Sequence, residues 1–333
     1  MQRGLGQALV MVIPALTLCA NVATAQYSCT SAWGSLGPAD GQFEGPQGIA
    51  VAPNGHVYVA EGANNCRVQE FTAAGTFVRK WGKMGSGPGQ FYNGLDVAVD
   101  PDGFVYVADA NAARVQKFSP EGTLLQSWGS RGAGPGQFAG SDLGIAVDNG
   151  RIYFADAGNH RVEVFDAAGA YITEWVTADS SGYWDPCALA ADGQGRLYVT
   201  AYAVTLPGSI VNNARVLEFD DMGALHKQWG TFGTASGELA GPCKIAVDGD
   251  RLVVVDVYAR RVALFARDGT YLGDAASECL RAPFAVASKG HGTVYVTDYD
   301  SDSVVGLSGC ATSPTESATW GRLKSRYRPA PLR

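Results

Sequence analysis

The sequence predicts an all-β fold, a six-bladed β-propeller of four-stranded blades in which the N-terminal strand completes the last blade. Two patterns support this fold. A tryptophan recurs at intervals of 47 to 54 residues, and each interval contains four short apolar runs that end in turn residues. Repeats of about 40 to 50 residues with four strands are typical of propeller blades. The recurring tryptophans are Trp33, Trp81, Trp128, Trp175 and Trp229.

The first repeat shows how the strands are ordered. Its four runs cover residues 48–51, 56–61, 67–71 and 76–81. Pro53-Asn54-Gly55 lies between the first and second runs, and Ala73-Ala74-Gly75 lies between the third and fourth. Both are typical hairpin turns. The first run of the first five repeats centres on an alanine, which suits inner strands crowded around a central axis. These alanines are Ala50, Ala98, Ala146, Ala190 and Ala246.

The sixth repeat is incomplete. Its second and third strands are expected at residues 293–298 and 303–307, and no outer strand follows them. Residues 27–33 repeat the pattern of the outer strand 76–81, so we expect them to pair beside 303–307 and close the ring. Closure would remove the exposed sheet edges that favour aggregation.

Three motifs resemble the repeats of NHL propellers: GIAVD at 144–148, YFAD at 153–156 and NHRV at 159–162. The resemblance extends over residues 27–308 and implies the six-bladed fold. It does not assign a function, because the family includes scaffolds, RNA-binding proteins and lyases.

The sequence predicts that the chain has three parts: a signal peptide, a propeller and a tail. Residues 1–25 read as a secretory signal peptide, with Arg3, an apolar stretch and a small-residue cleavage site after Ala25. Gln7 and Pro14 interrupt the stretch, so we expect no transmembrane segment. Residues 26–310 form the propeller, and 311–333 form a basic tail that we expect to be disordered. The protein is therefore expected to be secreted, periplasmic or on the cell surface.

The charge excludes one class of partner. The chain carries 25 basic and 32 acidic residues, a formal net charge of −7. Its last 23 residues hold five of the basic residues and one acidic residue, so the propeller itself is more acidic. An acidic body repels phosphate, and we expect no nucleic-acid partner.

Six cysteines remain after cleavage, and an oxidising compartment favours disulfides. The repeat alignment places Cys29 and Cys310 across one hairpin, so we expect a Cys29–Cys310 bond. The other four fall on the face where each inner strand begins, which we call the top face. Pairing between neighbouring blades gives Cys66–Cys279 and Cys187–Cys243, with a thiolate metal site as the alternative.

Five acidic residues occupy one repeat position and are followed by arginines. They could form a cation site, but the NHL pattern implies that they hold loops and link blades, which we expect. The acids are Glu61, Asp109, Asp156, Asp256 and Asp298, and the arginines are Arg67, Arg114, Arg161 and Arg261. The fourth repeat instead has Ala201 and a longer loop through Tyr202, Leu206, Pro207 and Asn212.

Candidate ligand-binding residues are those that depart from the repeat on the top face or bring polar and aromatic groups together there. Asp96 and Lys244 stand where other inner strands carry glycine or alanine, close to the channel mouth. The full set is Asp96, His160, Tyr202, Lys244, Tyr258 and Tyr299. We assign no catalytic or metal-binding residue, because His56, His226 and His291 fall in turns away from this face and no nucleophile motif is present.

We therefore interpret the protein as a monomeric binding or scaffold module that uses its top face. The expected partner is a peptide, a glycan, a small polar ligand or another protein. The alternative is a lyase- or lactonase-like enzyme with a divalent cation in the central channel. We expect no cofactor, with calcium or another divalent cation as the alternative.

Overall fold

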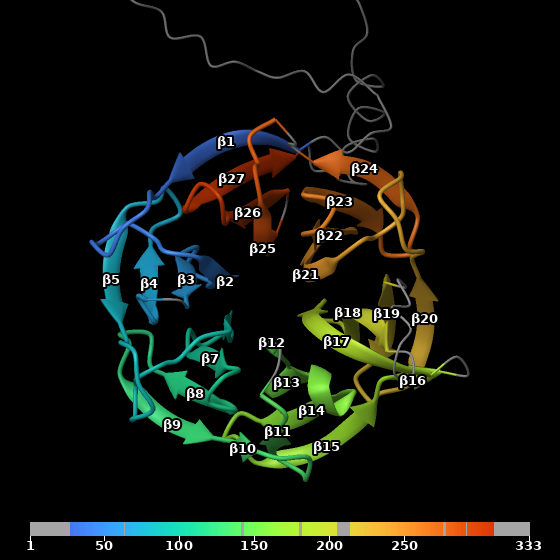
Figure 1. Cartoon of the computed structure of the whole chain (residues 1–333), viewed down its shortest axis with the longest axis horizontal. Helices are drawn as coiled ribbons and strands as arrows, with labels where there is room; N and C mark the ends of the chain where they lie inside the picture. Colours follow the sequence, from blue (N-terminus) through green and yellow to red (C-terminus); the bar gives the residue numbers. More distant parts are fainter. Residues whose placement is uncertain are drawn as a thin grey trace, which may run out of the picture.

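The computed structural model describes residues 27–62, 64–140, 143–179, 182–204, 214–275, 278–290 and 292–309. Six antiparallel sheets follow one another in chain order around a central axis, as Figure 1 shows. The predicted fold class is confirmed. The predicted signal peptide and tail lie outside the described residues, as do Leu206, Pro207, Asn212, His291 and Cys310.

The first three blades each run from the axis outward. Blade 1 contains β2 (Pro46–Val51), β3 (Val57–Glu61), β4 (Arg67–Phe71) and β5 (Phe77–Trp81). Blade 2 contains β6 (Leu95–Val99), β7 (Val105–Asp109), β8 (Arg114–Phe118) and β9 (Leu124–Trp128). The short β10 (Ser130–Arg131) and β11 (Gln137–Phe138) pair in the connection to blade 3. Blade 3 contains β12 (Leu143–Asp148), β13 (Arg151–Asp156), the 3-10 turn η1 (Ala157–Asn159), β14 (Arg161–Asp166) and β15 (Tyr171–Val176).

The remaining blades keep this order, with one addition in blade 4. Blade 4 contains β16 (Ala178–Asp179), β17 (Gly182–Ala191), β18 (Arg196–Val204), β19 (Ala214–Asp220) and β20 (Leu225–Trp229). Blade 5 contains β21 (Pro242–Asp248), β22 (Arg251–Asp256), β23 (Arg261–Ala266) and β24 (Tyr271–Ala275). Blade 6 contains β25 (Pro283–Gly290), β26 (Thr293–Asp298), β27 (Ser303–Gly309) and β1 (Tyr27–Trp33).

The ring closes as the sequence predicts. Strand β1 pairs antiparallel with β27, and Tyr27 lies opposite Gly309 while Trp33 lies opposite Val304. The Tyr27 side chain is buried, and its hydroxyl donates a hydrogen bond to Asp248 of blade 5. The N-terminal strand is therefore bound to two blades.

The recurring tryptophans pack between blades. The Trp81 ring, on the outer strand of blade 1, lies 6.0 Å from the Tyr58 ring and 5.7 Å from the Phe118 ring of blade 2. The hairpin of blade 2 approaches the same ring at Gly122, where an added Cβ atom would lie 2.7 Å from Trp81. Burial of large aromatic rings is a major source of stability, so this contact fixes each blade against the next.

The inner strands β2, β6, β12, β17, β21 and β25 contact one another in turn around the axis. Their central alanines are buried, which confirms the crowding inferred from the sequence. Among the described residues, no helix has the length and apolar character needed to cross a bilayer.

Candidate functional site

Four inner strands contain a β-bulge that directly follows a proline, which is the first residue of β2, β21 and β25 and lies inside β17. The pairing register shifts between Pro46 and Gly48, and in the same way after Pro186, Pro242 and Pro283. A bulge leaves one residue outside the ladder and redirects its side chain. The bulged residues are Gln47, Cys187, Cys243 and Phe284.

All four bulged residues line one cavity of about 320 Å³ on the top face. Blades 1, 2, 4, 5 and 6 contribute to its wall. The lining residues are Gln47, Gly94, Leu95, Cys187, Tyr202, Cys243, Lys244, Val257, Tyr258 and Phe284. This volume is at the lower end of the range of about 300 to 1,000 Å³ for ligand pockets.

An ion pair lies at the channel mouth. Lys244 Nζ, from blade 5, lies 2.8 Å from Asp96 Oδ2, from blade 2. The same carboxylate oxygen accepts a hydrogen bond of 3.1 Å from the Ile145 backbone N–H of blade 3. Blades 2 and 5 are opposite one another in a ring of six, so the pair spans the axis. Burial acts to lower the pKa of Lys244, but the neighbouring Asp96 carboxylate and Cys243 outweigh it and raise the pKa.

Two tyrosines and Phe284 form the aromatic part of the wall. Tyr202 is half-buried, and burial raises the pKa of its hydroxyl well above its usual range, so Tyr202 is a neutral donor. The Tyr258 side chain is 76% exposed. Its ring lies against Gly241, where an added Cβ atom would be 2.5 Å from a ring carbon, so the absence of a side chain there makes room for the tyrosine.

Besides Asp96, which contacts the cavity wall through Lys244, two further candidate residues lie outside the wall. Tyr299 packs on Phe284 with ring centroids 5.8 Å apart. His160, on the top of blade 3, hydrogen-bonds through Nδ1 to Asp185, and its ring stacks on Tyr183 at 5.2 Å. The structure therefore brings Tyr202, Lys244 and Tyr258 to one cavity, pairs Asp96 with Lys244, and leaves His160 at the junction of blades 3 and 4.

Sequence analysis missed Gln47, Phe284 and Val257 as lining residues. A signal for the first two was present, because a proline precedes the bulged residue at Pro46-Gln47 and Pro283-Phe284. Val257 belongs to the loop that also carries Tyr258. It had no signal of its own, since valine recurs in all the repeats.

The repeated acidic residues are structural, which confirms that interpretation. Their side chains have no exposed surface, and each accepts hydrogen bonds from backbone N–H groups. Asp256, for example, accepts from Ala240 at 3.0 Å and Gly241 at 2.7 Å in the loop that enters its own blade. The following arginines bind carbonyl oxygens of the same kind of loop, as Arg114 does with Gln90 at 2.8 Å. Acids and arginines thus hold the connections between blades.

The disulfide in the described structure corrects two predicted pairings. Cys29 is bonded to Cys279, with Cα atoms 6.5 Å apart, and not to Cys310. Cys279 is therefore not the partner of Cys66, whose thiol donates to the Tyr92 carbonyl at 2.6 Å. The physical reason is that Cys66 faces the connection to blade 2, while the connection to blade 6 brings Cys279 to the outer strand β1. The Cys187–Cys243 pairing stays a prediction, and both residues line the top cavity.

Among the described residues, one group of acidic, cysteine and histidine side chains is compact enough to hold a metal ion: Cys29, Glu278 and Cys279. It lies beside the outer strand of blade 6, not at the channel. Its two sulfur atoms are joined in the disulfide, so they do not offer thiolate ligands.

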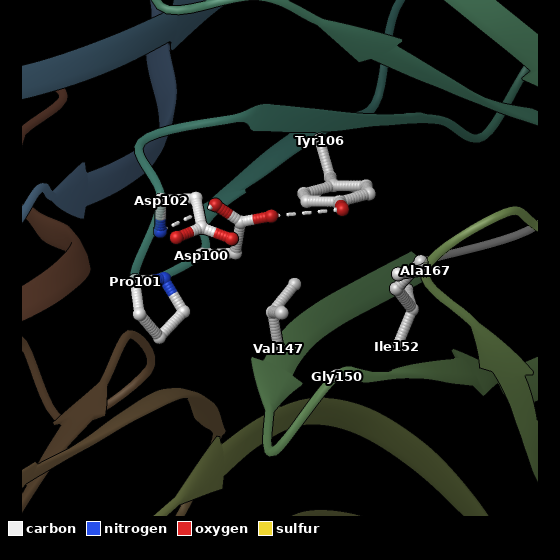
Figure 2. Close-up of a pocket in the computed structure, with 8 residues that line it drawn as sticks. All are labelled: Asp100, Pro101, Asp102, Tyr106, Val147, Gly150, Ile152 and Ala167. Carbon is white, nitrogen blue, oxygen red and sulfur yellow. Dashed lines mark hydrogen bonds between the residues drawn. The ribbon is translucent and has the colours of Figure 1, made fainter.

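A smaller cavity of about 150 Å³ lies on the opposite face, between the first hairpins of blades 2 and 3. Figure 2 shows Asp100 at its wall, accepting hydrogen bonds from the Asp102 backbone and the Tyr106 hydroxyl at 3.0 Å each. A third bond comes from the Phe104 N–H at 2.8 Å. The Asp100 carboxylate thus closes its own turn, and we give this cavity no binding role.

The fold defines the protein as a six-bladed β-propeller built from one repeat. The NHL repeat model matches residues 43–71, 92–118 and 143–165, which lie in blades 1, 2 and 3. Blades 1, 2 and 3 therefore contain NHL repeats, as the motifs in blade 3 indicated, within a six-bladed propeller. A search of curated proteins finds no match to its sequence.

Solved structures confirm the fold at low sequence identity. A gluconolactonase from Xanthomonas campestris is 17% identical, with a TM-score of 0.57 over 81% of this chain and 88% of that chain. Virginiamycin B lyase from Staphylococcus aureus is 15% identical, with a TM-score of 0.52 over 79% and 94% of the two chains. A chain of a nidogen/laminin complex is 14% identical, with a TM-score of 0.53 over 75% and 85%. Enzymes and binding proteins thus share this architecture.

Proposed function

We propose that the protein is a secreted binding module that holds a small polar ligand, or one residue of a peptide or glycan, in the top-face cavity. The observation that carries this proposal is the composition of the wall. Tyr202 of blade 4 and Lys244 and Tyr258 of blade 5 depart from the repeat at three separate positions, yet they line one cavity. A repeat protein gains nothing structural from such a convergence, whereas a binding site requires it.

The chemistry of the wall supports this class of ligand. Tyrosine and phenylalanine rings provide contact area at a small cost in side-chain entropy. Gln47 and the Lys244–Asp96 pair add polar groups beside this aromatic surface. A ligand with a flat or apolar face and a polar edge would therefore be oriented as well as held.

The predicted signal peptide and the Cys29–Cys279 bond support secretion, because disulfides persist mainly in oxidising compartments. The nidogen/laminin neighbour supports a binding role by analogy of fold alone.

Tyr258 gives the test of the site. Saturation-transfer NMR against a panel of monosaccharides and capped tripeptides should find a binder whose signal is lost in Tyr258→Ala. Tyr258 is exposed, so this change should leave thermal stability within about 0.5 kcal/mol of the parent. Tyr171→Ala, on the outer strand of blade 3, is the control and should bind normally. Equal binding by the two variants would place the site elsewhere and contradict the proposal.

The competing enzymatic function requires a divalent cation in the channel. Metal analysis of purified protein by mass spectrometry distinguishes the two functions. We expect less than one tenth of an equivalent of calcium, zinc or manganese per chain. A stoichiometric metal that is lost in Asp96→Asn would favour the enzyme over the binding module.

A further inference from the structure

Cys187 and Cys243 occupy the same position in two neighbouring blades. Each directly follows a proline of an inner strand, Pro186 in β17 of blade 4 and Pro242 in β21 of blade 5, and each is the bulged residue. The two strands contact each other, and both cysteines line the top cavity. Two thiol side chains therefore share one solvent-reachable wall.

The backbones of neighbouring inner strands nearly touch at this level. A Cβ atom added to Gly144 of blade 3 would lie 2.7 Å from the Ala188 Cα of blade 4. A Cβ atom added to Gly48 of blade 1 would lie 2.9 Å from the Asp96 Cα of blade 2. Ala188 and Lys244 are the corresponding residues of blades 4 and 5, and each directly follows one of the cysteines. A Cβ atom lies about 1.5 Å from its own Cα, so the Cα atoms of these pairs are at most about 4.4 Å apart, at the short end of the range of about 4.4 to 6.8 Å for a disulfide.

The direction of the side chain is shown by Gln47, which has the same position in blade 1. Its Oε1 accepts hydrogen bonds of 3.1 Å from the backbone N–H groups of Gly94 and Leu95 in blade 2. Leu95 corresponds to Cys243 in blade 5. The Gln47 side chain thus points to the equivalent residue of the next blade, and the same direction in blade 4 would bring Cys187 toward Cys243.

We propose that Cys187 and Cys243 form a reversible disulfide in the cavity wall, opened and closed by small thiols and disulfides that enter the cavity. One cysteine thiolate attacks a sulfur of glutathione disulfide, which forms a mixed disulfide and releases one glutathione thiolate. The second cysteine then displaces the other glutathione. The two cysteines lose two electrons and two protons, and glutathione disulfide gains them as two thiols.

The bond would join blades 4 and 5 at the residue next to Lys244. The oxidised form holds Lys244 and its ion pair in place, and the reduced form lets the strand starts separate. This effect on ligand affinity rests on the proposed function of the cavity, whereas the disulfide itself does not.

The test equilibrates the full mature chain in glutathione buffers from fully reducing to fully oxidising, followed by alkylation and peptide mass spectrometry. We expect a peptide pair linking Cys187 and Cys243 that disappears and returns reversibly with the buffer. In Cys243→Ser, Cys187 should instead carry one glutathione. Cys66 is buried and donates to a carbonyl, so it serves as the matched control and should be alkylated only after unfolding.

Either of two results would overturn the proposal: alkylation of both cysteines in the oxidising buffer, or a link from one of them to Cys66. The double variant Cys187→Ser/Cys243→Ser should keep the circular dichroism spectrum of the parent and lose only the redox response. If the linked pair forms but Tyr258→Ala binds every probe normally, the disulfide stands and the proposed binding function fails.

Discussion

Lys244 Nζ and Asp96 Oδ2 lie 2.8 Å apart and join two opposite blades across the channel mouth. Their side chains are 12% and 10% exposed, so both charges are largely removed from water. A buried pair of this kind adds little net stability, but loss of one partner leaves the other charge uncompensated. Other inner strands carry glycine or alanine here, so the pair is not needed for the fold.

The first prediction tests this argument. Lys244→Ala should lower the free energy of unfolding by about 2 to 4 kcal/mol, because Asp96 then stays buried without its cation. The double variant Asp96→Ala/Lys244→Ala should lose less than Lys244→Ala alone, since it restores the pattern of the repeat. Denaturant titrations of the parent, of Asp96→Ala, of Lys244→Ala and of the double variant measure the coupling. Additive losses would show that the pair does not interact across the channel.

Glu163 in blade 3 stands where blades 1 and 2 have Gln69 and Gln116. The Gln116 amide accepts from the Gly89 N–H at 2.8 Å and donates to the Gln90 carbonyl at 2.9 Å. Glu163 accepts from the Gly136 N–H at 2.8 Å, but its second oxygen, Oε2, is buried without a hydrogen-bond partner. A protonated Glu163 could donate a hydrogen bond from Oε2, as Gln116 does from its side-chain nitrogen. Burial accordingly raises the pKa of Glu163 to about 7.

The second prediction follows from that raised pKa. The folded state binds a proton more tightly than the unfolded state, so this contribution to stability is complete below about pH 4.5 and is lost as pH rises through about 7. Glu163→Gln should remove this dependence and raise stability at pH 8 by about 1 to 3 kcal/mol relative to the parent. Melting temperatures at pH 5 and pH 8 provide the measurement. A Gln variant that gains no more at pH 8 than at pH 5 would contradict the assignment.

The repeat made the fold predictable, while several features of the site depend on departures from it. Periodic tryptophans and the missing outer strand were enough to place β1 beside β27. The top cavity could be predicted only in part, because Tyr202 and Lys244 break the pattern visibly, whereas the role of Gln47 arises from a bulge. The Cys29–Cys279 bond could not be predicted from the repeat, since it joins an outer strand to a connection between blades.

The third prediction concerns that disulfide. The two cysteines are 250 residues apart in the sequence, so removal of the bond should raise the conformational entropy of the unfolded chain. Cys29→Ser/Cys279→Ser should cost about 3 to 5 kcal/mol in the chain-entropy model. Thermal unfolding under non-reducing conditions measures the loss. If adding a reductant lowered the melting temperature of this variant as much as that of the parent, the stabilising bond would lie between other cysteines.

The fourth prediction concerns the contact of tryptophan with the next hairpin. Gly122 has a φ of +84°, and an added Cβ atom would be 2.7 Å from the Trp81 ring. Gly193 has a similar φ of +72° but open space around it. Both alanine variants incur the backbone strain of about 1 to 2 kcal/mol, but only Gly122→Ala must displace a packed ring. Gly122→Ala should therefore be less stable than Gly193→Ala by about 1 to 3 kcal/mol in urea titrations.

Pairing of β1 with β27 has a consequence for synthesis of the chain. The ribosome makes β1 before the other strands of the propeller and β27 after them, with five complete blades between. The first strand must therefore wait, with its backbone groups unpaired, until translation has passed residue 309. Native ring closure therefore cannot precede the synthesis of β27, and the waiting strand is the segment that a chaperone would need to protect.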